Sequence, residues 1–296
     1  MYLPYPIKDD GLKIYHAHTW RYTDITQHIF DIKHAGFNTI QLSPCTPTKD
    51  NGTEWWKLYQ PTRFTIGNRL GTKEDLVKLV QESHKLGMYV IMDVVLRHTA
   101  GNNSGQLIPH ENCDPELVNN KHIWMPFEKG DHRNRNDVVN KCFGMPSLNY
   151  HIHETQEIYF KFLDEILSIC DGIRIDMAKH FALPMEHSNF WMNLLERYPD
   201  KIIYGECINL EDQYLREYDK LIGTLVEENT CNIYPNAIVF FESHDTYLEW
   251  KYTRKYNYWD CIHKWISLRN RYKNTIYFER PDTVSYYDIA KEINKK

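Results

Sequence analysis

Residues 73–98, KEDLVKLVQESHKLGMYVIMDVVLRH, contain the pattern that decides the fold. Residues 73–86 have the apolar spacing of an amphipathic helix, and the Thr72 and Asp75 side chains predict a capping box at its start. Gly87 ends the helix. Residues 88–96 form a nearly continuous apolar run, which is typical of a buried strand in a parallel sheet. We therefore expect a helix, a sharp turn and then a strand that ends in charged residues.

The same unit recurs along the chain. Repeated strand–helix units indicate an α/β protein with a parallel sheet, and at this length an eight-stranded (β/α)8 TIM barrel is the leading interpretation. A doubly wound open sheet is the alternative, although no glycine-rich phosphate-binding turn follows the first strand. The other strands are expected at 12–15, 38–42, 172–175, 201–204, 237–241 and 275–278, and the other helices at 24–35, 155–170, 189–197 and 259–271.

Two stretches depart from this repeat. Residues 99–149 are rich in Asn, His, Gly, Asp and Pro and are too long for an ordinary connection, so we expect a small inserted subdomain after the third strand. The barrel then comprises residues 1–98 and 150–296. Between Asn209 and Asn236 the chain is too short for a full strand–helix–strand–helix passage, which predicts an abbreviated sixth unit.

The composition excludes several classes of protein. With 42% hydrophobic and 14% aromatic residues, the chain can bury a core and is not disordered throughout. A net charge of -5 and the lack of a long basic run argue against a nucleic-acid partner. No apolar run approaches the ~20 residues of a membrane span, so no membrane partner is expected.

The cysteines and the first residues bear on localisation. The 7 cysteines are widely spaced and form no Cys-x-x-Cys pair, which favours free thiols over a zinc site or a disulfide framework. No signal peptide is visible at the start. We predict a cytoplasmic protein.

Functional groups follow four of the predicted strands. The carboxyl ends of barrel strands meet at one mouth, so these groups should converge there. Three carboxylates with histidines and an arginine suit glycoside hydrolysis, in which one carboxylate attacks the sugar and another carboxyl protonates the leaving oxygen. Arg174 lies two residues before Asp176 on the same strand face and can keep that carboxylate ionised. The groups are Asp93, Arg97 and His98; Arg174, Asp176, Lys179 and His180; Glu206; and Glu242, His244 and Asp245.

These four runs resemble the signature regions of the α-amylase family of glycoside hydrolases. Residues 40–44 (IQLSP), 58–61 (LYQP), 66–72 (IGNRLGT) and 278–281 (FERP) extend the resemblance, and the set is similar to a bacterial α-amylase subgroup. The resemblance implies that Asp176 is the nucleophile, Glu206 the general acid/base and Asp245 the third carboxylate. Because such enzymes act with retention, the first two carboxyl groups should lie about 5–5.5 Å apart.

The resemblance also implies a set of substrate-binding residues. Arg174, His98 and His244 would surround the cleaved glucose, on which Tyr59 would stack beside Gln60. Trp56 would extend this aromatic platform, although an ordinary rim aromatic is the alternative there. Lys179 and His180 would contact the leaving-side sugars.

The chain departs from the family at a structural calcium site. Arg97 replaces the usual Asn, and Ser147 stands where an Asp is common, so two oxygen ligands are missing. Calcium requires six to eight oxygens. We expect no metal or other cofactor, with the Arg97 guanidinium donating hydrogen bonds to carbonyls of the inserted subdomain and of His180. A solvent-directed Arg97 is the alternative. The chain ends about fifteen residues after Arg280, so no C-terminal β domain is expected.

We therefore expect a retaining hydrolase of α-1,4-glucosidic bonds in starch, glycogen or maltodextrins. A transglycosylase would use the same covalent intermediate but pass the glucosyl unit to a sugar. A non-catalytic α-glucan-binding protein is the third interpretation. The sequence leaves the oligomeric state open.

Overall fold

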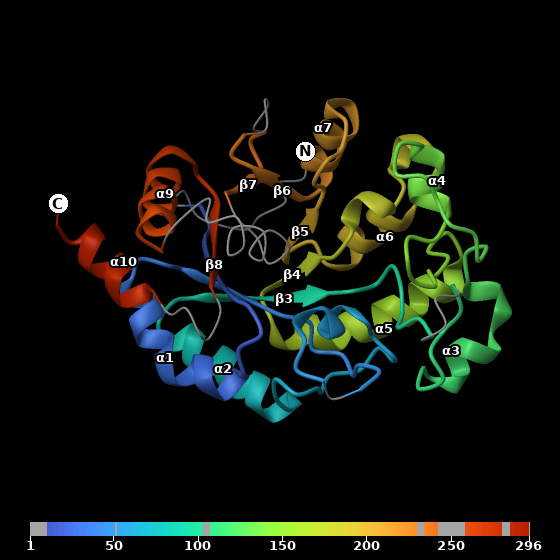
Figure 1. The fold of residues 1–296 in the computed structure, drawn as a ribbon, viewed down its shortest axis with the longest axis horizontal. Helices are drawn as coiled ribbons and strands as arrows, with labels where there is room; N and C mark the ends of the chain where they lie inside the picture. The colour runs from blue at the N-terminus through green and yellow to red at the C-terminus, as the bar shows by residue number, and fades with distance from the viewer. Residues whose placement is uncertain are drawn as a thin grey trace.

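The computed structural model describes residues 11–50, 52–102, 107–229, 234–241, 258–279 and 285–295. Eight parallel strands form one closed barrel in chain order (Figure 1). This confirms the (β/α)8 barrel and excludes the open sheet. The strands are β1 (Lys13–Ala17), β2 (Thr39–Leu42), β3 (Tyr89–Val94), β4 (Gly172–Ile175), β5 (Ile202–Glu206), β6 (Gly223–Glu227), β7 (Ala237–Phe240) and β8 (Thr275–Glu279).

Helices follow most of these strands. Among the described residues, the helices beside the barrel are α1 (Tyr22–His34), α2 (Lys73–Lys85), α5 (His153–Ile169), α6 (Phe190–Arg197), α7 (Asp212–Leu221), α9 (Tyr258–Arg271) and α10 (Tyr286–Ile293). At the start of α2 the Asp75 backbone N–H donates to the Thr72 hydroxyl (3.2 Å) and the Thr72 N–H donates to the Asp75 carboxylate (3.0 Å), which confirms the capping box. Gly87 ends this unit with a left-handed φ of 64°.

The barrel interior changes from apolar to polar along the strands. Ile14, Ile91, Ile202 and Ile276 belong to a buried cluster distinct from the main core. Successive inward positions lie two residues apart on a strand, so Asp93 follows Ile91 on the inner face. The interior is therefore apolar below the charged residues at the mouth.

The stretch between β5 and β7 differs from expectation in one respect. It holds a full helix, α7, and a five-residue strand, β6, neither of which the sequence patterns identified. The shortening falls after β6, where only residues 228–236 lead to β7, and 230–233 of these lie outside the described residues. The helix is amphipathic, with Leu215 and Tyr218 buried, but the expectation that residues 209–236 were too short for a full unit left it unassigned.

Residues 99–149 separate β3 from α5. Their described part contains α3 (Pro115–Asn119), the 3-10 turn η2 (Lys121–Ile123) and α4 (Arg135–Asn140). In Figure 1 these elements lie at the opposite end of the molecule from α9 and α10. Backbone hydrogen bonds join this segment to itself and to the end of β3: Met125 donates to Ser147 (2.8 Å), and Leu148 donates to Arg97 (2.9 Å).

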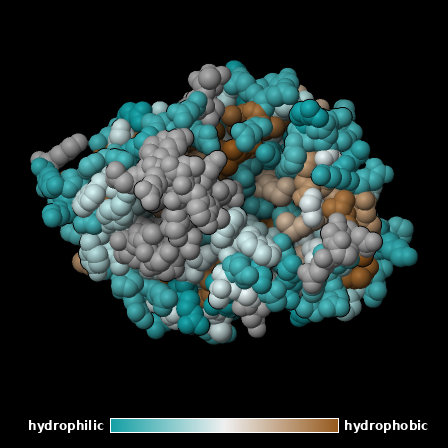
Figure 2. All heavy atoms as spheres, in the orientation of Figure 1, coloured by the Kyte–Doolittle hydropathy of each residue, from teal (hydrophilic) through white to brown (hydrophobic). Residues whose placement is uncertain are grey.

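The surface and the thiols add two observations. The face in Figure 2 is mostly hydrophilic, with apolar residues exposed in small groups. No helix in the described parts of the chain is long and apolar enough to cross a membrane. Six cysteines are buried, namely Cys45, Cys113, Cys142, Cys170, Cys207 and Cys261, and the first five of these have free thiols; Cys231 lies outside the described residues. The cytoplasmic localisation stays a prediction.

Candidate active site

Arg174 on β4 brings three carboxylates together at the barrel mouth. Its Nη1 donates to Asp93 Oδ1 (2.8 Å) and to Asp176 Oδ1 (2.9 Å), and its Nη2 donates to Glu206 Oε2 (2.6 Å). Arg174 and Asp93 are 2% and 1% exposed, and Asp176 is 6% exposed. The end of β3, the end of β4 and the end of β5 are thus joined through one guanidinium, as the barrel topology predicts.

Burial and charge set the protonation of this group. Removal from water raises the pKa of Asp93 and raises the pKa of Asp176 well above its usual range; the Arg174 guanidinium opposes both shifts. With Glu206, three carboxylates share one cation in a low-dielectric site. Burial thus favours the neutral forms of Asp93 and Asp176, and the Arg174 cation favours their ionised forms.

Tyr59 and His98 lie beside the carboxylates. The Tyr59 hydroxyl donates to Asp93 Oδ2 (2.9 Å), and the His98 Nε2 donates to the Tyr59 carbonyl (2.9 Å). Burial lowers the pKa of His98 to about 4, so its imidazole is neutral at pH 7. Both side chains are buried, and both lie next to the network that Arg174 organises.

The rim of the site is formed by the connection after β2. Trp56 in the 3-10 turn η1 (Trp55–Tyr59) is 40% exposed. The Lys49 and Lys57 amines lie over its ring, at 5.3 and 5.6 Å from the ring centroid. Gln60 is half-buried, and its Oε1 is buried without a hydrogen-bond partner among the described residues.

Lys179 and His180 lie in the 3-10 turn η3 (Ala178–His180), which follows Asp176. The Lys179 Nζ donates to the Ile208 carbonyl (2.8 Å), beyond the end of β5. The His180 Nδ1 donates to the Val138 carbonyl (2.8 Å) in the segment 99–149, and burial lowers the pKa of His180 to about 2. Both polar groups therefore have partners within the protein.

Asp245 and His244 lie outside the described residues, so their expected positions at the mouth stay predictions. The described residues before them end at Phe241, directly after β7.

Arg97 is buried and does not point to solvent. It is 1% exposed, and its Cζ lies 5.3 Å from the centroid of the Tyr150 ring. Its guanidinium donates to four backbone carbonyls: Nε to His180 (3.2 Å), Nη1 to Leu148 (2.9 Å), and Nη2 to Val139 (3.2 Å) and Lys141 (3.1 Å). These are the contacts predicted for Arg97, to the segment 99–149 and to the turn after Asp176.

These contacts do not fit a calcium ion at the same place. A guanidinium is a cation and offers hydrogen-bond donors only, whereas calcium requires oxygen ligands. The Ser147 hydroxyl donates to the Met145 carbonyl (3.3 Å). Within the described part of the chain, no group of three or more His, Cys, Asp or Glu side chains could hold a metal ion.

Sequence reasoning gave no role to three residues near the site. Arg135 on α4, Glu186 in the 3-10 turn η4 (Pro184–Glu186) and Tyr218 on α7 meet beside the turn that carries Lys179. No local pattern could have found them, because Arg135 is 51 residues from Glu186 and 83 from Tyr218 in the chain.

Comparison with known proteins identifies the family. The model of the α-amylase catalytic domain matches residues 21–107. An α-amylase of Clostridium acetobutylicum is 32% identical over 214 residues, which cover 67% of this chain and 28% of that protein. The chain belongs to the α-amylase family of glycoside hydrolases.

Two further relatives define the extent of this similarity. An α-amylase-related protein of Drosophila auraria is 27% identical over 57% of this chain and 37% of its own length. The structure of α-amylase I from Eisenia fetida matches with a TM-score of 0.68 at 21% identity, covering 82% of this chain and 60% of that chain. The match to the Eisenia fetida structure supports the fold. The chain spans about a third of the length of the Clostridium acetobutylicum and Drosophila auraria proteins.

Proposed function

We propose that this family member is a retaining glycoside hydrolase that cleaves α-1,4-glucosidic bonds in starch, glycogen or maltodextrins. Asp176 is the nucleophile and Glu206 is the general acid/base. The observation that carries this proposal is the Arg174 guanidinium, whose neighbouring nitrogens donate to Asp176 (2.9 Å) and to Glu206 (2.6 Å).

The shared guanidinium supports retention over inversion. An inverting enzyme needs a carboxyl separation of about 6.5–9.5 Å to admit a water molecule, whereas a retaining enzyme needs about 5–5.5 Å. Two carboxylates on neighbouring nitrogens of one guanidinium favour the short separation. They also favour a substrate that reaches both carboxyl groups from the open end of the barrel.

The reaction then proceeds in two displacements. An Asp176 oxygen forms a bond to the anomeric carbon while the bond to the glycosidic oxygen breaks, and Glu206 gives its proton to that oxygen. Glu206 next takes a proton from water, whose oxygen displaces Asp176 from the sugar. Glu206 accepts a hydrogen bond from Arg174 Nη2 (2.6 Å), which fixes its carboxyl group beside Asp176 for the proton transfer.

The other expected contacts keep their assignments as part of this proposal. His98 and Arg174 bind the cleaved glucose, with Tyr59 beside its ring and Gln60 offering a buried oxygen to a hydroxyl. Trp56 is exposed enough to stack on a further sugar. Asp245 and His244 are assigned to the same glucose, and Lys179 and His180 to the leaving-side sugars. The maltohexaose complex solved for a variant of the Eisenia fetida enzyme supports α-glucans as the ligand class.

We further propose that the chain needs no calcium between the barrel and the segment 99–149. Arg97 supplies the positive charge there and satisfies four carbonyls directly. A cation of fixed position thus joins the end of β3 to the turn after Asp176 without a metal.

The test is product release from maltoheptaose, followed by chromatography with and without a chelator. We expect shorter maltodextrins in both conditions. The Asp176→Asn variant should abolish hydrolysis and keep oligosaccharide binding. The matched control is Asp164→Asn, because Asp164 is an exposed carboxylate that pairs with Arg197 on the outer helices. Products longer than the substrate would identify a transglycosylase, and binding without any product would identify an α-glucan-binding protein.

A further inference from the structure

A second arginine lies beside the turn that follows the nucleophile. The Arg135 guanidinium donates to both oxygens of Glu186, from Nε (2.8 Å) and from Nη2 (2.6 Å), and its Nη1 donates to the Lys179 carbonyl (2.5 Å). Its Nη2 also donates to the Tyr218 hydroxyl (3.0 Å). We call Arg135, Glu186 and Tyr218 the Arg135 cluster.

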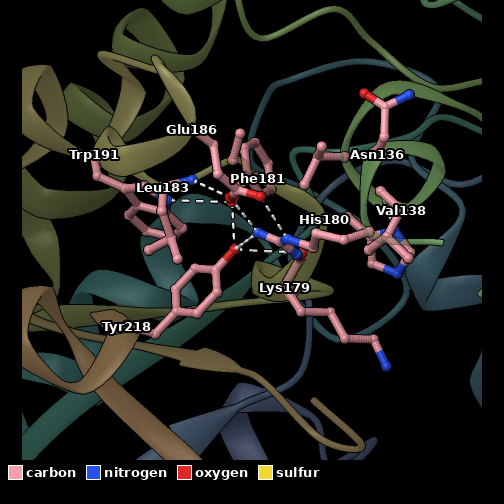
Figure 3. Close-up of polar contacts among 12 residues, drawn as sticks. Asn136, Val138, Lys179, His180, Phe181, Leu183, Glu186, Trp191 and Tyr218 are labelled. Carbon is pink, nitrogen blue, oxygen red and sulfur yellow. Dashed lines mark hydrogen bonds and ion pairs between the residues drawn. The ribbon is translucent and has the colours of Figure 1, made fainter. Parts of the chain in front are cut away.

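The Arg135 cluster binds the turn at several backbone groups. The Tyr218 hydroxyl donates to the Phe181 carbonyl, and the Glu186 Oε2 accepts from the Leu183 N–H (2.8 Å). Figure 3 shows Glu186, Tyr218 and the turn at Lys179–Phe181 converging on one place. Three parts of the chain, α4 of the segment 99–149, η4 and α7, thus hold one short stretch of backbone.

The cluster is shielded from water. The side chains of Arg135 and Glu186 are 12% and 18% exposed. The Arg135 Cζ lies 4.8 Å from the centroid of the Tyr214 ring. A bidentate pair in such surroundings fixes geometry more strongly than an exposed pair, because solvent does not compete for its hydrogen bonds.

The turn that this cluster holds is strained next to the nucleophile. Met177 follows Asp176 directly and has a left-handed conformation, with φ 50° and ψ 38°. A residue with a Cβ avoids this region unless its surroundings impose it. The Met177 N–H donates to Glu206 Oε2 (3.5 Å). The sharp turn therefore places the backbone that follows Asp176 next to the Glu206 carboxyl group.

Lys179 extends the connection to the acid/base strand. The Arg135 cluster holds its carbonyl, and its amine donates to the Ile208 carbonyl, two residues beyond Glu206. The turn after β4 is therefore joined to the turn after β5 by the Lys179 side chain. A displaced turn would move Asp176 and Glu206 relative to one another.

We propose that Arg135, Glu186 and Tyr218 are positioning residues, which hold the strained turn at 177–183 and thereby set the placement of Asp176 and Glu206. This inference rests on the proposed function for its catalytic consequence. Its structural part is independent: the segment 99–149 controls the shape of the turn through Arg135. In the described part of the chain, the polar contacts of Arg135 and Glu186 are with one another, Tyr218 and the turn backbone, and not with Asp176 or Glu206, so they act through the turn.

The test compares Arg135→Met with Arg197→Met. Arg197 also makes a bidentate pair, with Asp164, but the two side chains are 44% and 46% exposed on the outer helices. We measure amide hydrogen exchange by peptide, together with kcat and KM on maltoheptaose. In Arg135→Met we expect the amides of 178–183 to exchange about tenfold faster while the barrel strands keep their protection.

The same variant should lose about 10²-fold in kcat, with a smaller change in KM, because a displacement near 1 Å suffices for such a loss. Arg135→Lys keeps the charge without the planar fork and should restore part of kcat. Arg197→Met should leave both readouts at the wild-type level. Unchanged exchange in 178–183, or acceleration spread evenly over the strands, would overturn the proposal.

The two readouts separate this inference from the proposed function. If the wild-type protein produces nothing from maltoheptaose, the proposed function fails, and the exchange pattern alone decides whether the Arg135 cluster holds the turn. If the wild-type protein is active and Arg135→Met exchanges faster at full kcat, the positioning role is wrong.

Discussion

Replacing Arg97 by Met should destabilise the protein strongly. The methionine keeps most of the apolar stem and removes every donor to the carbonyls of Val139, Lys141, Leu148 and His180. The Val139 carbonyl keeps the Tyr150 hydroxyl as a donor (3.1 Å), so three carbonyls lose the partner that Arg97 provides. An unsatisfied buried acceptor costs at least ~1 kcal/mol, so three amount to about 3 kcal/mol. Relief of the burial of the guanidinium lowers this figure, and water that enters the space lowers it further. We expect a net loss of about 2 kcal/mol.

The assay is urea unfolding followed by far-UV circular dichroism, at equal protein concentration, in EDTA and in excess calcium. The wild-type midpoint should be the same in both. Arg97→Lys should lie between the wild type and Arg97→Met, because an ammonium keeps the charge but reaches fewer carbonyls. The double change Arg97→Asn and Ser147→Asp restores oxygen ligands and should make the midpoint rise with calcium. A loss under about 1 kcal/mol in Arg97→Met, or calcium-dependent stability in the wild type, would refute the reasoning.

Three further predictions follow from buried titratable groups. Burial lowers the pKa of His98 to about 4, so between pH 6.5 and 4 the unfolded chain binds a proton that the folded chain does not. The free energy of unfolding should therefore fall by about 3 kcal/mol over this range. His98→Gln should flatten this part of an acid-unfolding curve. The pKa of His180 is lowered further, to about 2, so the loss should continue below pH 4 and shrink in His180→Gln. Burial and Arg269 lower the pKa of Lys13 to about 8, and its amine donates to the Tyr272 and Lys273 carbonyls (2.8 Å each); stability should therefore rise between pH 8 and 10.5 in calorimetry, and Lys13→Met should remove the rise.

The barrel was predictable because its evidence is local. Residues 72–98 contain a capping pair, an apolar helix face, a glycine with positive φ and a buried strand, all within 27 positions of the sequence. Each feature depends on residues that are close together in the sequence, so it can be recognised without knowing how the rest of the chain folds. The sequence prediction failed to identify β6 and α7 because residues 209–236 were expected to be too short for a full unit. Leu215, Tyr218 and Leu221 have the spacing of a helix face, and β6 is only five residues long.

The strand ends were predictable for a related reason. Arg174 and Asp176 share a strand face two residues apart, and Asp93 and Glu206 lie at the ends of β3 and β5, the two neighbours of β4. Once the strands are in order, the closed barrel brings these groups to one place. The contacts of Arg174 with Asp176 and Glu206 (2.9 and 2.6 Å) follow from the order of the strands and do not depend on the conformation of the connecting segments.

The position of Arg135 could not be predicted from the sequence. Its side chain is chemically the same as that of Arg174, yet its partners lie 44 to 83 residues away on a turn and a helix that no periodic sheet aligns. The position of Arg135 depends on how the whole segment 99–149 packs on the barrel, and that packing also depends on Arg97 and its four carbonyls. Arg97, which is buried, and Arg135, which is half-buried, thus act on the same turn, at His180 and at Lys179. Loss of either should loosen the other, so the stability losses of Arg97→Met and Arg135→Met should differ from additivity in a double-mutant cycle. Strict additivity would mean that each arginine holds its own carbonyl and that the turn is not a shared unit.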